Sequence, residues 1–350
     1  MIIFIAALLI LIAFSSRLSI KDFNGDYISR DGINGIKGIF VILILLSHAK
    51  GYFTPDAPLD KPYMMIQNHI GQMVVALFLF YSGYGIMEQI KKRGFDYIMT
   101  IPKKRFPSLL LNFDLAVILY IILGLILGNS YTPLQLLYGF TAWEGIGNSS
   151  WYIFVTFALY LLVFLCFLSI KAINNKQRYI YPAIVFCVMT VLLMIGIKAA
   201  GKDTWWYNTA HLFPLGMLYS YFKDRIEKAV MKNNLTWCIT LAVLISGWIV
   251  SRHFSYTYYN MYYAYGIMFT LSIVIITMKL KVDGKVLNWF GKHIFSIYIL
   301  QRIPMIVLSR LGLADFNGWL FTALSIAITV PLAAGFDYLT GKLNKLIWKK

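Results

Sequence analysis

Two ionisable side chains, Lys37 and His48, stand eleven residues apart in the apolar stretch GIKGIFVILILLSHAKGYF, residues 35–53. Eleven α-helical residues make about three turns, so both side chains share one helix face at a separation of about 16 Å. That distance is about half the thickness of the hydrocarbon core of a bilayer, ~30 Å. Because an ionisable group is costly to bury in hydrocarbon, a pair of this kind indicates a functional site.

His48 is the leading candidate for chemistry. A neutral imidazole takes up a proton near neutral pH, which is the task of a general base that activates a hydroxyl for acyl transfer. The alternative is a histidine that hydrogen-bonds a neighbouring helix. For Lys37 the alternative to a functional role is a topology anchor, because a lysine at the end of a span commonly holds the helix at the membrane surface. Their shared face favours a joint role.

The elements that must position this pair are membrane helices. The 350 residues are 59% hydrophobic and only 13% charged, which is more apolar than a soluble domain requires. We expect eleven spans, near residues 2–16, 33–50, 70–90, 107–128, 151–170, 179–197, 205–222, 235–251, 258–278, 288–310 and 319–340. The expected fold class is therefore all-α, a polytopic bundle with about ten core spans and one additional N-terminal span.

The domain organisation follows from the same pattern. We expect an extra N-terminal transmembrane helix within residues 1–20 and one transmembrane domain over 30–345, without an appended soluble domain. The three cysteines fall inside apolar runs without CxxC spacing, which indicates buried thiols. The histidines apart from His48 lie in separate segments without an HExxH or HxxxH pair, so we expect no metal site and interpret them as structural.

The net charge of +17 reflects topology. Lysines and arginines gather in alternate loops, within 17–37, 91–105, 171–178, 223–232, 279–292 and 342–350. The positive-inside rule places these loops in the cytoplasm, with the N-terminus outside and the C-terminus inside. Because the cations lie in separate clusters and not on one basic face, we expect no nucleic-acid partner.

The loop stretch AWEGIGNSSWYIF, residues 142–154, offers polar and aromatic groups on the outer side. Glu144 is its acidic residue and is a candidate to orient His48 or an acceptor hydroxyl. Ser149 and Trp151 are candidate substrate contacts, although a serine there also suits a helix cap and a tryptophan suits the membrane interface. Arg302 lies inside an apolar run, where a cation needs a partner; structural pairing and substrate contact both stay open.

A donor site is suggested at the basic turn PKKRFP. Lys103, Lys104 and Arg105 precede an expected helix, where cations and free backbone N–H groups suit phosphate binding. The alternative is that these charges only set topology. A Gly-rich nucleotide loop is absent from the sequence, so a dinucleotide-binding fold is not indicated.

Five stretches together resemble the transmembrane acyltransferases called acyltransferase family 3. The stretch KGIFVILILLSH is similar to the first core helix of that family, and FLFYSGYGI to its second. PKKRFPSLLL resembles its basic cytoplasmic turn, NSSWYIFVTFALYLL its Trp-bearing outer helix start, and FGKHIFSIYILQRIP its penultimate helix. The matches run in the family's order from about residue 30 to 310.

The resemblance implies transfer of an acyl group, usually acetyl, from cytoplasmic acyl-coenzyme A to a hydroxyl of a surface carbohydrate. It makes His48 the catalytic histidine and Lys37 the basic partner on the donor side. The sequence departs from the family at three places. Asn34 stands where an acidic residue is common, the RxxR signature is not intact, and Gln301 replaces a common histidine, so position 301 supplies no base.

We therefore expect a membrane O-acetyltransferase in a bacterial plasma membrane, with acetyl-CoA as co-substrate and no permanently bound cofactor. The expected acceptor is a cell-surface polysaccharide, with a capsule preferred, or a lipid-linked sugar. Direct transfer with His48 as general base and an acyl-histidine relay both stay open. The alternatives are a carrier or flippase for a lipid-linked sugar or an acyl donor, and a sensor or scaffold whose charges only set topology.

Overall fold

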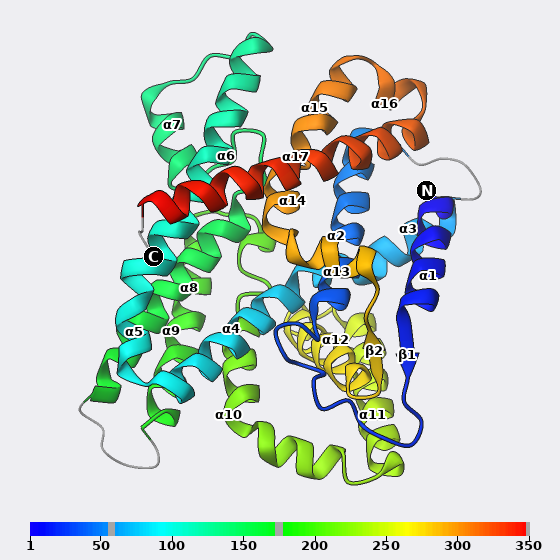
Figure 1. Ribbon diagram of the computed structural model, residues 1–350, viewed down its shortest axis with the longest axis vertical. Helices are drawn as coiled ribbons and strands as arrows, with labels where there is room; N and C mark the ends of the chain where they lie inside the picture. Colours follow the sequence, from blue (N-terminus) through cyan, green and yellow to red (C-terminus); the bar gives the residue numbers. More distant parts are fainter. Residues whose placement is uncertain (55–59, 172–177, 348–350) are drawn as a thin grey trace.

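Long apolar helices form most of the chain (Figure 1). The computed structural model describes residues 1–54, 60–171 and 178–347. Three lysines of the expected basic clusters, Lys176, Lys349 and Lys350, lie outside these described residues. The observed class is the expected one, an all-α polytopic membrane bundle.

Within the described residues, seven helical segments are long and apolar enough to cross a membrane. Each coincides with an expected span. They are α2 (Asn34–Ala49) with the short turn η1 (Lys50–Tyr52), α3 (Lys61–Ile70) with α4 (Met73–Arg93), α5 (Phe95–Thr100) continued through η3 (Ile101–Arg105) into α6 (Phe106–Ile126), α8 (Trp151–Phe167) with η4 (Leu168–Lys171), α9 (Ile180–Ala199), α11 (Asn234–Phe254) and α17 (Gly318–Ile347).

The other four expected spans are also helical but differ in length or continuity. Helices α1 (Ile2–Ser15) and α12 (Met261–Thr277) are apolar but shorter. The helix expected from residue 205 starts later, at α10 (Leu212–Val230), because Thr204–Trp206 form a separate short turn, η5. The boundary expected at 205 was therefore wrong.

The span expected over 288–310 is broken into α13 (Lys285–Lys292), α14 (Ile294–Leu300) and α15 (Arg302–Arg310). Pro304 explains the second break, because a proline has no N–H to donate to the carbonyl four residues earlier and its ring clashes with that carbonyl. The Tyr120 hydroxyl donates a hydrogen bond to the carbonyl of Ile299 at 2.8 Å beside this break. The interruption leaves Gln301 and Arg302 at a bend in mid-span.

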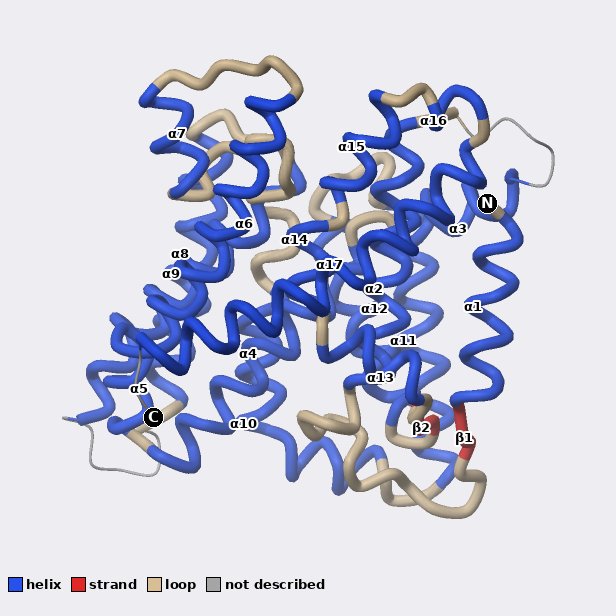
Figure 2. Tube along the Cα trace, turned by 45° about the horizontal axis from the view of Figure 1, so that its top comes forward, coloured by secondary structure: helices blue, strands red, loops and turns tan. Residues whose placement is uncertain are grey.

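The remaining elements are short. They are α7 (Pro133–Phe140), α16 (Leu313–Phe316) and the strands β1 (Ser16–Leu18) and β2 (Leu280–Val282). The strands pair antiparallel, with Ser16 opposite Val282 (Figure 2). This ladder joins the end of α1 to the chain that follows α12.

Three of the basic segments lie at one end of the bundle. The loop after β1, the turn between α10 and α11, and β2 are at the lower end in Figure 1, whereas α7, α15 and α16 lie at the upper end. We call the lower end the basic end and the upper one the opposite end.

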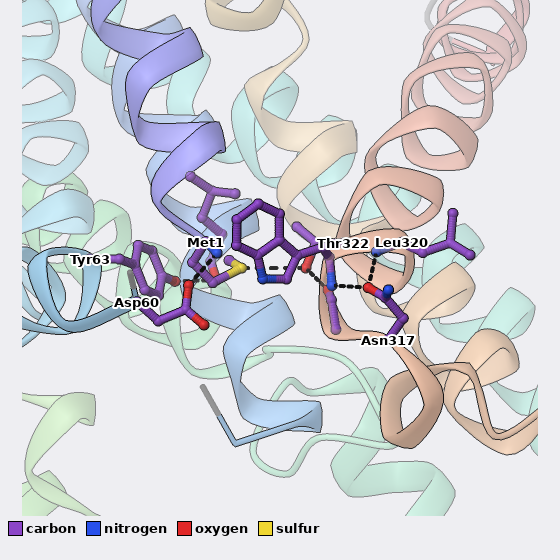
Figure 3. A network of polar contacts seen from close by, with 9 residues as sticks. Met1, Asp60, Tyr63, Asn317, Leu320 and Thr322 are labelled. Carbon is purple, nitrogen blue, oxygen red and sulfur yellow. Dashed lines mark hydrogen bonds and ion pairs between the residues drawn. The ribbon is translucent and has the colours of Figure 1, made fainter. Parts of the chain in front are cut away.

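Helix α1 is tied to the rest of the bundle through its first residue. The amino group of Met1 pairs with the carboxylate of Asp60, and the Thr322 hydroxyl donates to the Met1 sulfur at 3.8 Å (Figure 3). Tyr63, on α3, donates its hydroxyl to the Leu46 carbonyl at 2.6 Å. Contacts between α1, α3, α2 and α17 therefore converge at the opposite end.

Helices α4 and α10 touch through two glycines. A Cβ on Gly83 would lie 2.0 Å from the carbonyl oxygen of Phe213, and a Cβ on Gly216 would lie 2.0 Å from that of Phe80. Small residues allow membrane helices to approach closely, and dispersion contacts then stabilise the pair. Either glycine can be replaced only if the helices separate.

We expect Gly83→Ala to destabilise the folded protein by about 1–3 kcal/mol, because the added methyl overpacks this helix contact. The matched control is Gly85→Ala on the same helix, where a Cβ would meet nothing within 4 Å. That substitution should be neutral or stabilising by up to ~1 kcal/mol through helix propensity. Thermal unfolding in detergent measures both changes, and equal melting temperatures for the two variants would contradict the close packing.

Candidate active site

Helix α2 carries Lys37 and His48 into two different cavities. The helix is held in place by α13, where a Cβ on Gly38 would lie 2.0 Å from the Leu287 carbonyl oxygen and one on Gly291 would lie 1.9 Å from that of Asn34. This close packing sets α2 directly beside the segment that continues into α14. The histidine and the broken span are thereby brought together.

The His48 cavity lies toward the opposite end and has a volume of about 410 Å³. Its walls come from α2, the α3–α4 turn, the loop before α8, η5 and the start of α15. Its lining residues other than glycines and aliphatic side chains are Ser47, His48, Gln72, Asn148, Ser149, Ser150, Trp151, Trp205, Trp206 and Arg302.

Four of the residues expected at the site from the sequence meet in this cavity: His48, Ser149, Trp151 and Arg302. They come from segments separated by more than 90 residues along the chain. Glu144 is placed differently, since its side chain is exposed in the loop and does not line the cavity. The neighbouring loop residue Gly145 lines it instead.

The basic cavity lies toward the basic end and has a volume of about 1030 Å³. Small-molecule sites commonly measure ~300–1,000 Å³, so this one accommodates a large ligand. Of the described residues, six basic and two acidic side chains line it: Arg30, Lys37, Arg93, Lys104, Arg105 and Lys223 against Asp26 and Glu88. Glu88 already accepts a hydrogen bond from Ser220 at 2.7 Å and pairs with Lys91. The cavity is strongly cationic.

The basic turn predicted from the sequence is a π-helical turn, η3, between α5 and α6. Such wider turns are frequent at functional sites. Lys104 and Arg105 line the basic cavity, whereas Lys103 does not. The Arg105 guanidinium lies 5.6 Å from the centre of the Tyr97 ring and 5.8 Å from that of Tyr160, so aromatic faces hold it in position.

Part of the cavity wall is the loop that follows β1. The loop residues that line the cavity are Gly25, Asp26, Ile28, Ser29, Arg30 and Ile33. The loop is fixed by Lys279, which is 4% exposed and donates hydrogen bonds to the carbonyls of Ser19, Ile20 and Asp22 at 3.3, 3.0 and 3.3 Å. The charge of the buried Lys279 is therefore stabilised by three backbone carbonyls and not, in the described part of the chain, by a carboxylate.

The two cavities adjoin near His48. Val75 lines both. Tyr298 lines the basic cavity, and its ring centre lies 6.2 Å from that of His48 and 5.5 Å from that of Tyr152. A thin layer of side chains, mostly aromatic, therefore separates a cationic chamber from the chamber that holds the histidine.

Three residues that line the His48 cavity each have a buried polar atom without a hydrogen-bond partner among the described residues. The atoms are His48 Nδ1, Asn148 Nδ2 and Arg302 Nε. Buried polar groups are normally hydrogen-bonded, so atoms without partners gathered at a cavity indicate a place for water or for polar atoms of a ligand. The orientation of the Asn148 amide is defined, because its Oδ1 accepts the Ile146 N–H at 3.2 Å.

The sequence interpretation missed several residues of these cavities. Arg30, Arg93 and Lys223 looked like other loop cations, and Tyr298 and Tyr152 stood inside quoted motifs without being singled out. A cation at a helix end has the same local pattern whether it faces a cavity or water. The sequence offered no signal to separate them.

Fold and cavities together define a multi-pass membrane protein with a histidine in one of two adjoining chambers. The chain belongs to acyltransferase family 3, since the family model described as an acyltransferase domain matches residues 30–338. It is therefore a membrane acyltransferase, and α1 precedes the matched region. Searches of the curated proteins and of the solved structures found no match for the chain.

We expect cysteines in the two cavities to be accessible from different ends. In a variant with Cys166, Cys187 and Cys238 replaced, Ser47→Cys should react with a membrane-impermeant thiol reagent only from the opposite end, and Ser82→Cys only from the basic end. Labelling of intact cells and inverted vesicles measures this.

The control is Ser325→Cys, which is fully buried in α17 and should stay unlabelled from both ends. Labelling of both cavity cysteines from the same end would contradict the two-chamber arrangement.

Proposed function

We propose that the protein is an O-acetyltransferase that moves an acetyl group from acetyl-CoA to a hydroxyl of a cell-surface polysaccharide. One observation carries the proposal: Lys37 and His48, on one helix, line two adjoining cavities that share Val75. The two residues are about 16 Å apart along that helix. Such a path suits a reaction whose donor and acceptor lie on different sides of a membrane.

The orientation follows from charge. Lysines and arginines are retained on the cytoplasmic side of membrane proteins, so the basic end faces the cytoplasm and the His48 cavity faces outward. Acetyl-CoA is a cytoplasmic metabolite, and the acceptor is an extracytoplasmic glycan. The membrane is the plasma membrane of a bacterium.

Donor binding is assigned to the basic cavity. Coenzyme A carries several phosphate charges, and Lys37, Arg93, Lys104 and Arg105 supply cations on its walls. Arginine binds phosphate through paired N–H donors, whereas lysine acts as a point charge. With its phosphates held there, the pantetheine arm extends along α2 and presents the thioester near Tyr298 and His48.

The acceptor hydroxyl enters the His48 cavity, where Trp151, Trp205 and Trp206 offer flat faces for a sugar ring. His48 accepts the proton of the hydroxyl as its oxygen attacks the thioester carbonyl carbon. The C–O bond forms, the C–S bond breaks, and the proton passes from the imidazolium to the departing thiolate. Asn148 Nδ2, which has no hydrogen-bond partner among the described residues, donates a hydrogen bond to the oxygen that becomes negative during attack. A capsular polysaccharide is the acceptor we favour.

We expect His48→Ala to lower acetyl incorporation into surface polysaccharide by about 10²–10⁴-fold, the contribution typical of a general base. The measurement compares acetyl content of the polysaccharide in cells with the intact protein, the variant or no copy, at equal membrane levels. The matched control is His253→Ala, an exposed histidine that lines neither cavity, which should acetylate normally.

Equal acetylation by His48→Ala and the intact protein would remove the general-base role. A change in export of unmodified polymer without any acetyl gain would favour a carrier and contradict the enzyme.

We expect Arg105→Gln to weaken coenzyme A binding about tenfold or more, because a charge-assisted hydrogen bond contributes ~1.5–3 kcal/mol. Lys92→Gln is the control, since Lys92 carries the same charge near the same end but is exposed and does not line the cavity. Calorimetric titration of the purified protein with coenzyme A measures both. Equal affinities for the two variants would place the donor outside the basic cavity.

A further inference from the structure

Arg302 is the one charged side chain, apart from the titratable His48, among the described residues that line the His48 cavity. Its Nε is buried and has no hydrogen-bond partner there. Within the described chain, no carboxylate lies within ion-pair distance of its guanidinium. The cation is therefore not neutralised by the protein as the structure describes it.

Four groups that interact electrostatically with Arg302 supply no negative charge either: His48, Tyr52, Tyr120 and Tyr298. A tyrosine hydroxyl is uncharged at neutral pH, and an imidazole is neutral or positive. These four neighbours are polar or aromatic groups and carry no anion.

The position of Arg302 in the fold adds to the free-energy cost of burying its charge. It is the first residue of α15, beside the break that Pro304 causes in mid-span. The N-terminus of a helix carries a partial positive charge that disfavours a nearby cation. A cation inside a membrane span is costly as well, and it is retained where it serves a function.

A neutral sugar does not require this cation. Trp151, Trp205 and Trp206 supply stacking faces, while Asn148 and Ser149 supply hydrogen-bonding groups. Gln72 donates a hydrogen bond to the Trp205 carbonyl and so holds the backbone at that residue. These groups suffice for a neutral sugar without Arg302. The guanidinium of Arg302 suits a carboxylate or a phosphate, because it binds either group through two N–H donors.

We propose that the acceptor is an acidic glycan whose carboxylate or phosphate group pairs with Arg302 in the His48 cavity. The inference rests on the proposed acetyl transfer and adds the charge of the acceptor to it. Arg302 then determines specificity: it holds the anionic group of the glycan while a hydroxyl of the same glycan meets His48.

The test uses the purified full chain in lipid nanodiscs with acetyl-CoA and three matched acceptors. Methyl glucoside is neutral, carboxymethyl glucoside adds a carboxylate at the anomeric position, and glucose 1-phosphate adds a phosphate there. All three keep the same hydroxyls free, at positions 2, 3, 4 and 6 of the glucose unit. The readout is kcat/KM for acetyl ester formation with each acceptor, expressed as the ratio of an anionic acceptor to the neutral one.

We expect a ratio of about 10 to 100 for at least one anionic acceptor, the gain typical of a charge-assisted hydrogen bond. The anionic acceptor with the higher ratio shows whether the site prefers a carboxylate or a phosphate. In Arg302→Gln the ratio should fall to about one, and Arg302→Lys should restore part of it. Arg310→Gln, at the exposed end of the same helix and outside the cavity, should keep the intact ratio.

Two results would overturn the inference alone: an intact protein with a ratio of one or less, or an Arg302→Gln variant that loses activity equally with neutral and anionic acceptors. The second result would assign Arg302 to a step common to all acceptors, such as stabilising the thioester oxygen. Absence of ester from every acceptor, together with unacetylated polysaccharide in cells, would overturn the proposed function itself.

Discussion

The cost of placing a lysine and a histidine in a membrane span is the constraint on which the rest of this structure depends. Neither side chain can face lipid without a large penalty, so neighbouring helices must shield both and leave polar space beside them. Helices α4, α8 and α14 contribute walls to the two cavities, and α13 packs directly against α2. The two cavities are the physical consequence, one for each ionisable residue.

Close helix contacts make this shielding possible. Glycines at the α4–α10 and α2–α13 crossings allow backbones to approach to distances that a single methyl would prevent. The approach of α13 to α2 brings Tyr298 beside His48, and Pro304 then ends α14 so that Arg302 meets the same cavity. Irregular backbone at membrane depth is tolerated where it lines a cavity. The π turn at η3 lines the basic cavity, and Arg302, beside the helix break, lines the His48 cavity.

Charge divides the site into two chemical environments. The basic cavity concentrates cations on walls drawn from the β1–α2 loop, α4, η3 and α10, and its electrostatic potential favours a polyanionic donor. The His48 cavity contains tryptophans, neutral hydrogen-bonding groups and one arginine, which suits a glycan. An aromatic layer between them separates the two ligands while leaving only a short path for the acyl group.

The sequence by itself determined the all-α membrane class and the place of most spans, because the length of an apolar run and the charge of a loop are local properties that decide insertion and orientation in a bilayer. Its motifs also indicated the family. It also singled out Lys37, His48, Arg105, Ser149, Trp151 and Arg302, since their residue types are unusual in apolar or motif-bearing stretches. Only the tertiary structure decided which loop cations face a cavity, that Lys103 and Glu144 do not line one, and that Tyr298 and Val75 lie at the boundary. Those facts depend on which helices pack together. Helix packing in lipid is determined by shape and by small-residue contacts between segments far apart in the chain. The hydropathy of one segment carries no information about these contacts.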